Sequence, residues 1–207
     1  RLGTRLQTGG ELPAAFMADG GTILVAGDQS ARVLEVAAIQ APALAVHKRV
    51  RVVQFKPGGG VLLTGSEDAT ARLWNLADGR PLGLPMPHLA TVSAVDFTPD
   101  GRMIATGSQD AAVRIWDADG KPIGLPISQT HWVSLVMFSP DGKRLVVGRE
   151  DNSTQVFDLE TRSPLGSPMI HPGSFPGAAV RHLKVLADGL MAISASNDGT
   201  IGRIDLT

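Results

Sequence analysis

Histidine and aspartate are the residues of this chain best suited to chemistry, because imidazole titrates near neutral pH and a carboxylate serves as a base or a calcium ligand. The 207-residue sequence has five histidines. Five of its aspartates recur along the chain at intervals of 40, 42, 41 and 47 residues. They are Asp28, Asp68, Asp110, Asp151 and Asp198. This spacing indicates a repeated unit rather than one catalytic centre.

The residues around each aspartate also repeat. GSEDATARLWNL at 65–76 returns as GSQDAAVRIWDA at 107–118. Fainter copies are AGDQSARVLEV at 26–36, GREDNSTQVFDL at 148–159 and SASNDGTIGRIDL at 194–206. Five copies at a period near 40 predict stacked supersecondary units.

Each unit reads as short β-strands separated by turns. Residues 91–117 divide into TVSAVDF, RMIATGS and AAVRIWD, with Pro-Asp-Gly and Gln-Asp between them. A fourth segment follows, written PLGLPMP at 81–87, PIGLPI at 122–127 and SPLGSPMI at 163–170. Proline cannot donate to a strand ladder, so this segment is expected at the outer edge of its sheet.

Four short strands per period, with Trp-Asp or Trp-Asn ending the third, resemble the WD40 repeat family of β-propellers. The resemblance implies an all-β fold with five four-stranded antiparallel blades in a single domain, 1–207. The chain ends on a third strand, and RLGTRL at 1–6 is similar to a fourth strand. We therefore expect the N-terminal strand to pair with the C-terminal blade and close the ring. Three alternatives stay open: a fragment of a larger propeller, part of a multidomain protein, and an oligomer whose chains complete a ring together.

The resemblance also implies a hydrogen-bonded network that holds each blade. Its members are a His before the first strand, a Ser or Thr ending the second, an Asp in the next turn and a Trp in the third. The matching residues are His47, Ser66, Asp68 and Trp74 in the second copy, and His88, Ser108, Asp110 and Trp116 in the third. The fourth copy keeps His131 and Asp151 but has Arg149 and Phe157 at the other positions, and the fifth keeps Ser196 and Asp198 but has Ile204 for Trp. His171 and His182 receive no role, and His171 opens an insertion, HPGSFPG.

Catalytic and cofactor motifs do not occur in the sequence: there is no HExxH, GxSxG, Walker or dinucleotide-binding signature and no cysteine. A ring of the five turn aspartates suggests calcium sites, but each lacks the neighbouring oxygen ligands of a calcium loop. We expect these aspartates to stabilise turns, and we predict a non-enzymatic protein without metal or cofactor.

Binding is then expected on one rim of the propeller, at positions that the network leaves free. The candidates are Arg49, Arg51, Glu67, Gln109, Trp132, Glu150 and Arg181. Trp132 is the strongest, because neither the network nor the apolar alternation of its strand requires it; the alternative is packing against the adjacent blade. A formal charge of −1 and strand-sized apolar runs predict neither a nucleic-acid nor a membrane partner. The lack of cysteine suits a cytoplasmic location.

These observations favour a scaffold or sensor that binds a protein or peptide on the rim. The connectors resemble those of bacterial WD arrays, which are often fused to signalling domains such as kinases or nucleotide-switch ATPases. The alternatives are a lectin-like binder of small molecules or glycans, and an enzymatic propeller. Phosphopeptide binding through Arg49, Arg51 and Arg181 is a variant of the first hypothesis.

Overall fold

The protein is described by a computed structural model. It describes residues 48–173 and 177–206 in full, together with the backbone of four short N-terminal strands between residues 14 and 45. Every regular element among them is a β-strand, and all strand pairs are antiparallel. The prediction of an all-β fold is therefore confirmed. None of the described elements is a helix that could cross a membrane.

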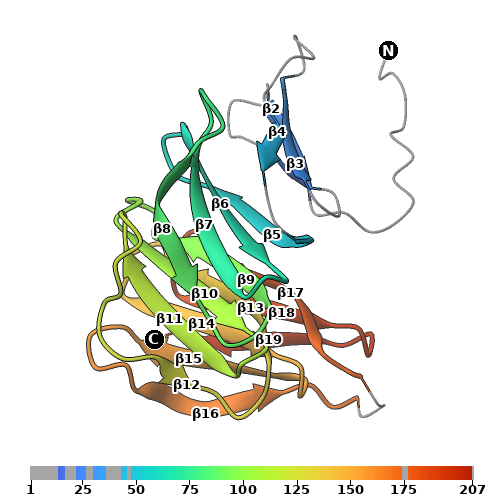
Figure 1. Ribbon diagram of the computed structural model, residues 1–207. Coiled ribbons are helices and arrows are strands. Elements are labelled where there is room, and N and C mark those ends of the chain that lie inside the picture. Colours follow the sequence, from blue (N-terminus) through green and yellow to red (C-terminus); the bar gives the residue numbers. More distant parts are fainter. Residues whose placement is uncertain are drawn as a thin grey trace.

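Four consecutive sheets make up the main part of the chain (Figure 1). The second sheet contains β5 (Val50–Phe55), β6 (Val61–Ser66), β7 (Thr70–Asn75) and β8 (Pro81–Pro87). The third contains β9 (Val92–Phe97), β10 (Met103–Ser108), β11 (Ala112–Asp117) and β12 (Ile127–Ser128), and the fourth contains β13 (Val133–Phe138), β14 (Arg144–Arg149), β15 (Ser153–Asp158) and β16 (Pro164–Ile170). The fifth contains β17 (Val180–Val185), β18 (Met191–Ser196) and β19 (Ile201–Asp205). Before them, a first sheet pairs β1 (Ala14–Phe16), β2 (Thr22–Ala26), β3 (Ser30–Glu35) and β4 (Ala43–Ala45).

Neighbouring sheets pack through their first strands, because β9 contacts both β5 and β13, and β13 also contacts β17. The second strand carries a glycine where the next sheet comes closest. A Cβ on Gly107 would lie 2.4 Å from Val133 Cγ1, and one on Gly148 would lie 3.0 Å from Val180 Cγ1. Only glycine allows this approach without a shift of the neighbouring strand.

Apolar side chains fill the spaces between sheets. Leu63, Val95 and Ile104 are buried with Trp116 between the second and third sheets. Val113, Val136 and Phe157 belong to a cluster between the third and fourth. In the second, third and fourth sheets, five of the six residues of each second strand are buried, so these strands lie in the interior of the sheets.

The fourth strands lie at the outer edge, as their prolines predict. In β8 and β16 nearly every residue is exposed. In the third sheet the proline-bearing segment forms only the two-residue β12 and an isolated bridge between Trp116 and Pro122.

A closed ring of five four-stranded blades is not seen among the described strands. The fifth sheet has three strands in the order β17-β18-β19, and none of the described N-terminal strands hydrogen bonds to it. The strand that we expected to complete it, residues 1–6, lies outside the described residues.

Candidate functional site

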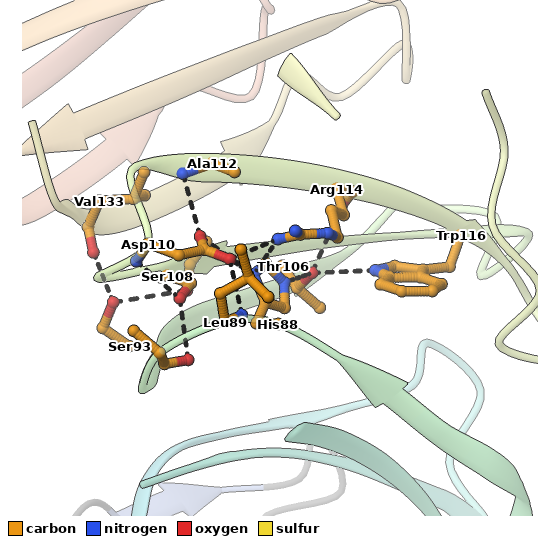
Figure 2. A network of polar contacts seen from close by, with 12 residues as sticks. His88, Leu89, Ser93, Thr106, Ser108, Asp110, Ala112, Arg114, Trp116 and Val133 are labelled. Atoms are coloured by element: carbon orange, nitrogen blue, oxygen red, sulfur yellow. Dashed lines mark hydrogen bonds and ion pairs between the residues drawn. The ribbon is translucent and has the colours of Figure 1, made fainter. Parts of the chain in front are cut away.

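The third sheet contains a complete buried hydrogen-bonded network (Figure 2). The Trp116 indole donates to Thr106 Oγ1 at 2.9 Å, and Thr106 Oγ1 lies 2.7 Å from His88 Nε2. The other imidazole nitrogen, Nδ1, lies 3.1 Å from Asp110 Oδ2. With the proton on Nδ1, His88 donates to Asp110 and accepts the Thr106 hydroxyl, so each group has a partner.

Thr106, rather than Ser108, links the histidine to the tryptophan, which corrects the predicted network. The two residues are two positions apart and therefore lie on the same face of β10. Thr106 lies at mid-strand and reaches the Trp116 indole, whereas Ser108 is the last residue of the strand, where the register with β9 shifts, and serves the turn. Ser108 Oγ donates to Ala90 O at 3.0 Å and accepts the Asp110 N–H at 3.0 Å.

The second sheet repeats this division of roles. Trp74 Nε1 donates to Thr64 Oγ1 at 2.9 Å. Ser66 Oγ donates to Arg49 O at 3.2 Å and accepts the Asp68 N–H at 3.2 Å. His47 lies outside the described residues, as does Asp28 of the first copy.

In the fourth sheet, His131 does not occupy the histidine position, contrary to the prediction. The histidine position is the residue directly after a fourth strand, and its N–H donates to the carbonyl of a turn residue that has positive φ. These bonds run from His88 to Ala69, from His171 to Asn152 and from Gln129 to Ala111. Gln129 therefore takes the place of the histidine. His131 lies on the surface with 56% of its side chain exposed, 2.8 Å from Asp151 Oδ2.

The positions of Thr106 and Trp116 are apolar in this sheet. Val147 aligns with Thr106, and Phe157 aligns with Trp116; both are buried. Arg149, at the position of Ser108, is buried and donates to Thr130 Oγ1 at 3.1 Å.

The fifth sheet uses His171, whose role the sequence analysis missed. Its Nε2 lies 2.9 Å from Ser194 Oγ and its Nδ1 lies 2.7 Å from Thr200 Oγ1, and the residue is 3% exposed. The signal was the string PMPH at 85–88, which returns as PMIH at 168–171 directly after β16. His182, in contrast, is exposed on β17.

The described turn aspartates accept hydrogen bonds from backbone N–H groups. In the four described turns, one carboxylate oxygen accepts the N–H of the residue two positions later. The residues are Asp68, Asp110, Asp151 and Asp198. Desolvation raises the pKa of Asp110, but hydrogen bonds from the Leu89 N–H and from Arg114 hold it below the ordinary value. Hydrogen bonds from Thr200 and Asn152 do the same for the pKa of Asp198 against desolvation. Among the fully described residues no group of three or more His, Asp or Glu side chains is placed to hold a metal ion.

Two buried groups of the third sheet have shifted pKa values. Desolvation, reinforced by the charge of Arg114, lowers the pKa of His88 to about 4 even though Asp110 opposes the shift, so His88 is neutral near neutral pH. Desolvation raises the pKa of Asp96 to about 6, although its Oδ2 accepts the Phe138 N–H at 2.8 Å.

The rim candidates occupy equivalent positions in four successive sheets. In each, the residue before the turn aspartate donates its N–H to the carbonyl at the start of the first strand, over 3.0 to 3.2 Å. The pairs are Glu67 to Arg49, Gln109 to Thr91, Glu150 to Trp132 and Asn197 to Ala179. Because all four bonds lie at the same end of their sheets, the structure brings these predicted residues onto one edge.

Trp132 is 55% exposed on this edge, so it is not packed away against an adjacent blade. The charged rim candidates Arg51, Glu67, Glu150 and Arg181 form ion pairs with one another. Arg181 makes two contacts to the Glu150 carboxylate, at 3.0 and 3.3 Å, and Arg51 lies 3.5 Å from Glu67 Oε1. The edge therefore offers an exposed indole flanked by paired charges and by Gln109.

Comparison with known proteins agrees with this geometry. The family model described as "WD domain, G-beta repeat" matches residues 42–75, 79–117 and 124–158. The matched segments cover the second, third and most of the fourth sheets. No curated protein matches the chain.

Proposed function

Because the chain belongs to the WD40 repeat family, we propose that it is a non-enzymatic scaffold or sensor that binds a protein or peptide on the edge bearing Trp132. WD40 repeats are generally protein-interaction scaffolds. The observation that carries the proposal is the exposure of Trp132 at a position whose backbone is fixed by the bond to Glu150. Tryptophan and arginine on a rigid support are the side chains that most often anchor interfaces.

The charges of this edge favour a polar protein surface as partner. Arg51 and Arg181 each contact a carboxylate, so a phosphopeptide would have to displace Glu67 and Glu150. The mixed signs do not form the continuous basic track that phosphate backbones require. A glycan binder would be expected to repeat its aromatic platform, and Trp132 is the single aromatic residue of the rim candidates.

The proposal includes closure of the ring by residues 1–6 beside β19. This closure would cover the free edge of the fifth sheet, which otherwise invites pairing with another chain. Light scattering tests it: a monomeric molar mass supports closure within one chain, whereas a larger assembly means that the blades complete a ring between chains.

Binding on the rim is tested by comparing proteins captured by the wild type with those captured by Trp132→Ala combined with Arg51→Ala. The control is Arg102→Ala, whose highly exposed side chain lies in the turn between β9 and β10, at the opposite end of the sheet. We expect the rim variant to lose a partner that the control keeps. Identical captures by all three proteins would refute the proposed surface.

A further inference from the structure

A groove of about 1150 Å³ lies between the second and third sheets, with His88 and Trp116 of the interior network among its lining residues, and none of the rim candidates lines it. One wall consists of β8 and the residues after it, including Leu84 and Leu89, which are 84% and 88% exposed. The other wall is the turn and strand segment from Ala118 to Pro126, with Trp116 at its base. Apolar side chains this exposed contribute favourably when a partner covers them.

The corresponding space between the third and fourth sheets is filled by the chain itself. Arg162 extends from the turn between β15 and β16, and its guanidinium donates to the carbonyls of Ile123 and Leu125. The equivalent turn position of the third sheet is Gly120; both residues have positive φ, 58° and 80°. The groove is therefore open because a glycine stands where the next repeat has an arginine.

The backbone of β8 presents acceptors to this groove. Each fourth segment has a leucine or isoleucine, a glycine with positive φ, and a proline two residues later. Arg162 donates to this segment in the third sheet, and Gln155 donates to Leu165 O and Gly166 O in the fourth. Among the fully described residues, no side chain donates to the carbonyls of Leu82, Gly83 or Leu84. Prolines at 81, 85 and 87 remove N–H groups from this strand, so its edge offers more acceptors than donors.

The charges that line the groove are mostly positive. Lys56 and Lys121 face a single carboxylate, Asp119, and Arg114 is already bound to Asp110 at 2.7 Å. This balance complements a partner that carries acidic residues. The volume exceeds the range of about 300–1,000 Å³ common for small-molecule pockets, which favours a peptide.

We propose that this groove is a second binding site, which takes an extended peptide with apolar and acidic side chains. Its apolar side chains cover Leu84, Leu89 and the prolines. Its backbone N–H groups donate to the carbonyls of Leu82, Gly83 and Leu84. Its carboxylates lie near Lys56 and Lys121.

Selection of short random peptides on the wild-type protein tests the proposal, followed by affinity measurement of a selected peptide by fluorescence polarisation. We expect the selected sequences to combine leucine-like residues with Asp or Glu. Gly120→Arg copies the residue that closes the neighbouring space, and a Cβ at Gly120 meets no atom closer than 3.4 Å. It should weaken binding by about tenfold or more.

Substitution of two exposed side chains separates a loss of binding from a loss of folding. Leu84→Ser and Lys121→Glu should each weaken binding by several-fold, with unchanged thermal unfolding, while Trp132→Ala should leave it unchanged. The proposal is overturned if no peptide is selected, if the selected peptides are basic, or if their affinity is unaffected by Gly120→Arg and Leu84→Ser. Sensitivity to Trp132→Ala alone would assign the peptide to the rim and also overturn it.

Discussion

The first three strands of the third and fourth sheets pair in the same register, yet the two sheets fill their interiors differently. The third holds His88, Thr106 and Trp116 in a hydrogen-bonded series, whereas the fourth has Gln129, Val147 and Phe157 at the same positions. The polar groups that depend on one another have been replaced together. This is what the energetics of buried hydrogen bonds require, because removing one partner leaves the others unsatisfied, while removing a whole set of partners costs little.

The difference teaches that each interior histidine keeps a full set of partners or is replaced: the fifth sheet has no tryptophan, and His171 is bound by Ser194 and Thr200 instead. The fourth sheet shows the cost of incomplete replacement, because buried Gln129 Oε1 has no hydrogen-bond partner. The turn aspartate is retained in both sheets, since its contacts to the backbone do not depend on the interior residues.

The largest effect is expected when one residue of the third sheet's network is replaced by its counterpart in the fourth sheet while the other network residues stay. Thr106→Val leaves both the Trp116 N–H and His88 Nε2 without a partner, and should lower the free energy of unfolding by about 2–4 kcal/mol. Adding His88→Gln and Trp116→Phe reproduces the fourth sheet. The triple variant should be more stable than the sum of the three single effects predicts, by about 1 kcal/mol or more. Urea unfolding of the wild type, the three single variants and the triple variant measures these effects, and simple additivity would refute the interpretation.

The next largest effect is expected from acidification, which should change the stability of the third sheet through His88 and Asp96. The fourth sheet has Gln129 and Met137 at these positions, and neither residue titrates. The pKa of His88 is about 4 in the folded protein and 6.5 ordinarily, so its stabilising effect is complete above pH 6.5 and is lost as the pH falls toward 4. The pKa of Asp96 is raised from 3.8 to about 6, so the same acidification stabilises the folded state through that carboxyl. The two effects oppose each other in the wild type.

Asp96→Asn should expose the histidine effect. We expect this variant to lose about 3 kcal/mol of unfolding free energy between about pH 7 and pH 4 through His88, a larger loss than in the wild type. Adding His88→Gln should remove most of that difference. An Asp96→Asn variant whose pH dependence matches the wild type would contradict the assignment of Asp96, and one whose pH dependence is unchanged by His88→Gln would contradict that of His88.

The packing between sheets should give an intermediate effect. Gly107→Ala places a Cβ 2.4 Å from Val133 Cγ1, and should cost about 1–3 kcal/mol by overpacking. Gly148→Ala meets its nearest atom at 3.0 Å and should cost less. Thermal unfolding of the two variants compares the interfaces directly, and an equal or reversed order would show that the neighbouring strands shift freely.

The smallest expected effect concerns the rim between the fourth and fifth sheets. Arg181→Ala removes the contacts to Glu150, both of which are partly exposed, and should change the unfolding free energy by about 1 kcal/mol or less. Trp132→Ala should be similarly mild. A large destabilisation by either would mean that the edge serves folding rather than binding.

The sequence by itself determined the repeat, the strands and the placement of prolines at the outer edges, because these follow from local turn chemistry and from a period written five times. It also placed the rim residues, since Glu67, Gln109 and Glu150 precede their turn aspartates in an invariant local register. A position that is defined by residues next to it in the sequence, such as the one before each turn aspartate, can be predicted from the sequence.

The tertiary structure alone decided which polar residues meet. Ser108 and Thr106 are both hydroxyl residues on the same face of one strand, and only their contacts to other strands separate the turn residue from the interior one. His131 and Gln129 were separable only through the cross-strand bond to Ala111. The groove beside Gly120 is open because this turn lacks an arginine, whereas Arg162, 42 positions later, fills the corresponding space of the next sheet. These outcomes depend on contacts between strands and between sheets, which sequence distance does not encode.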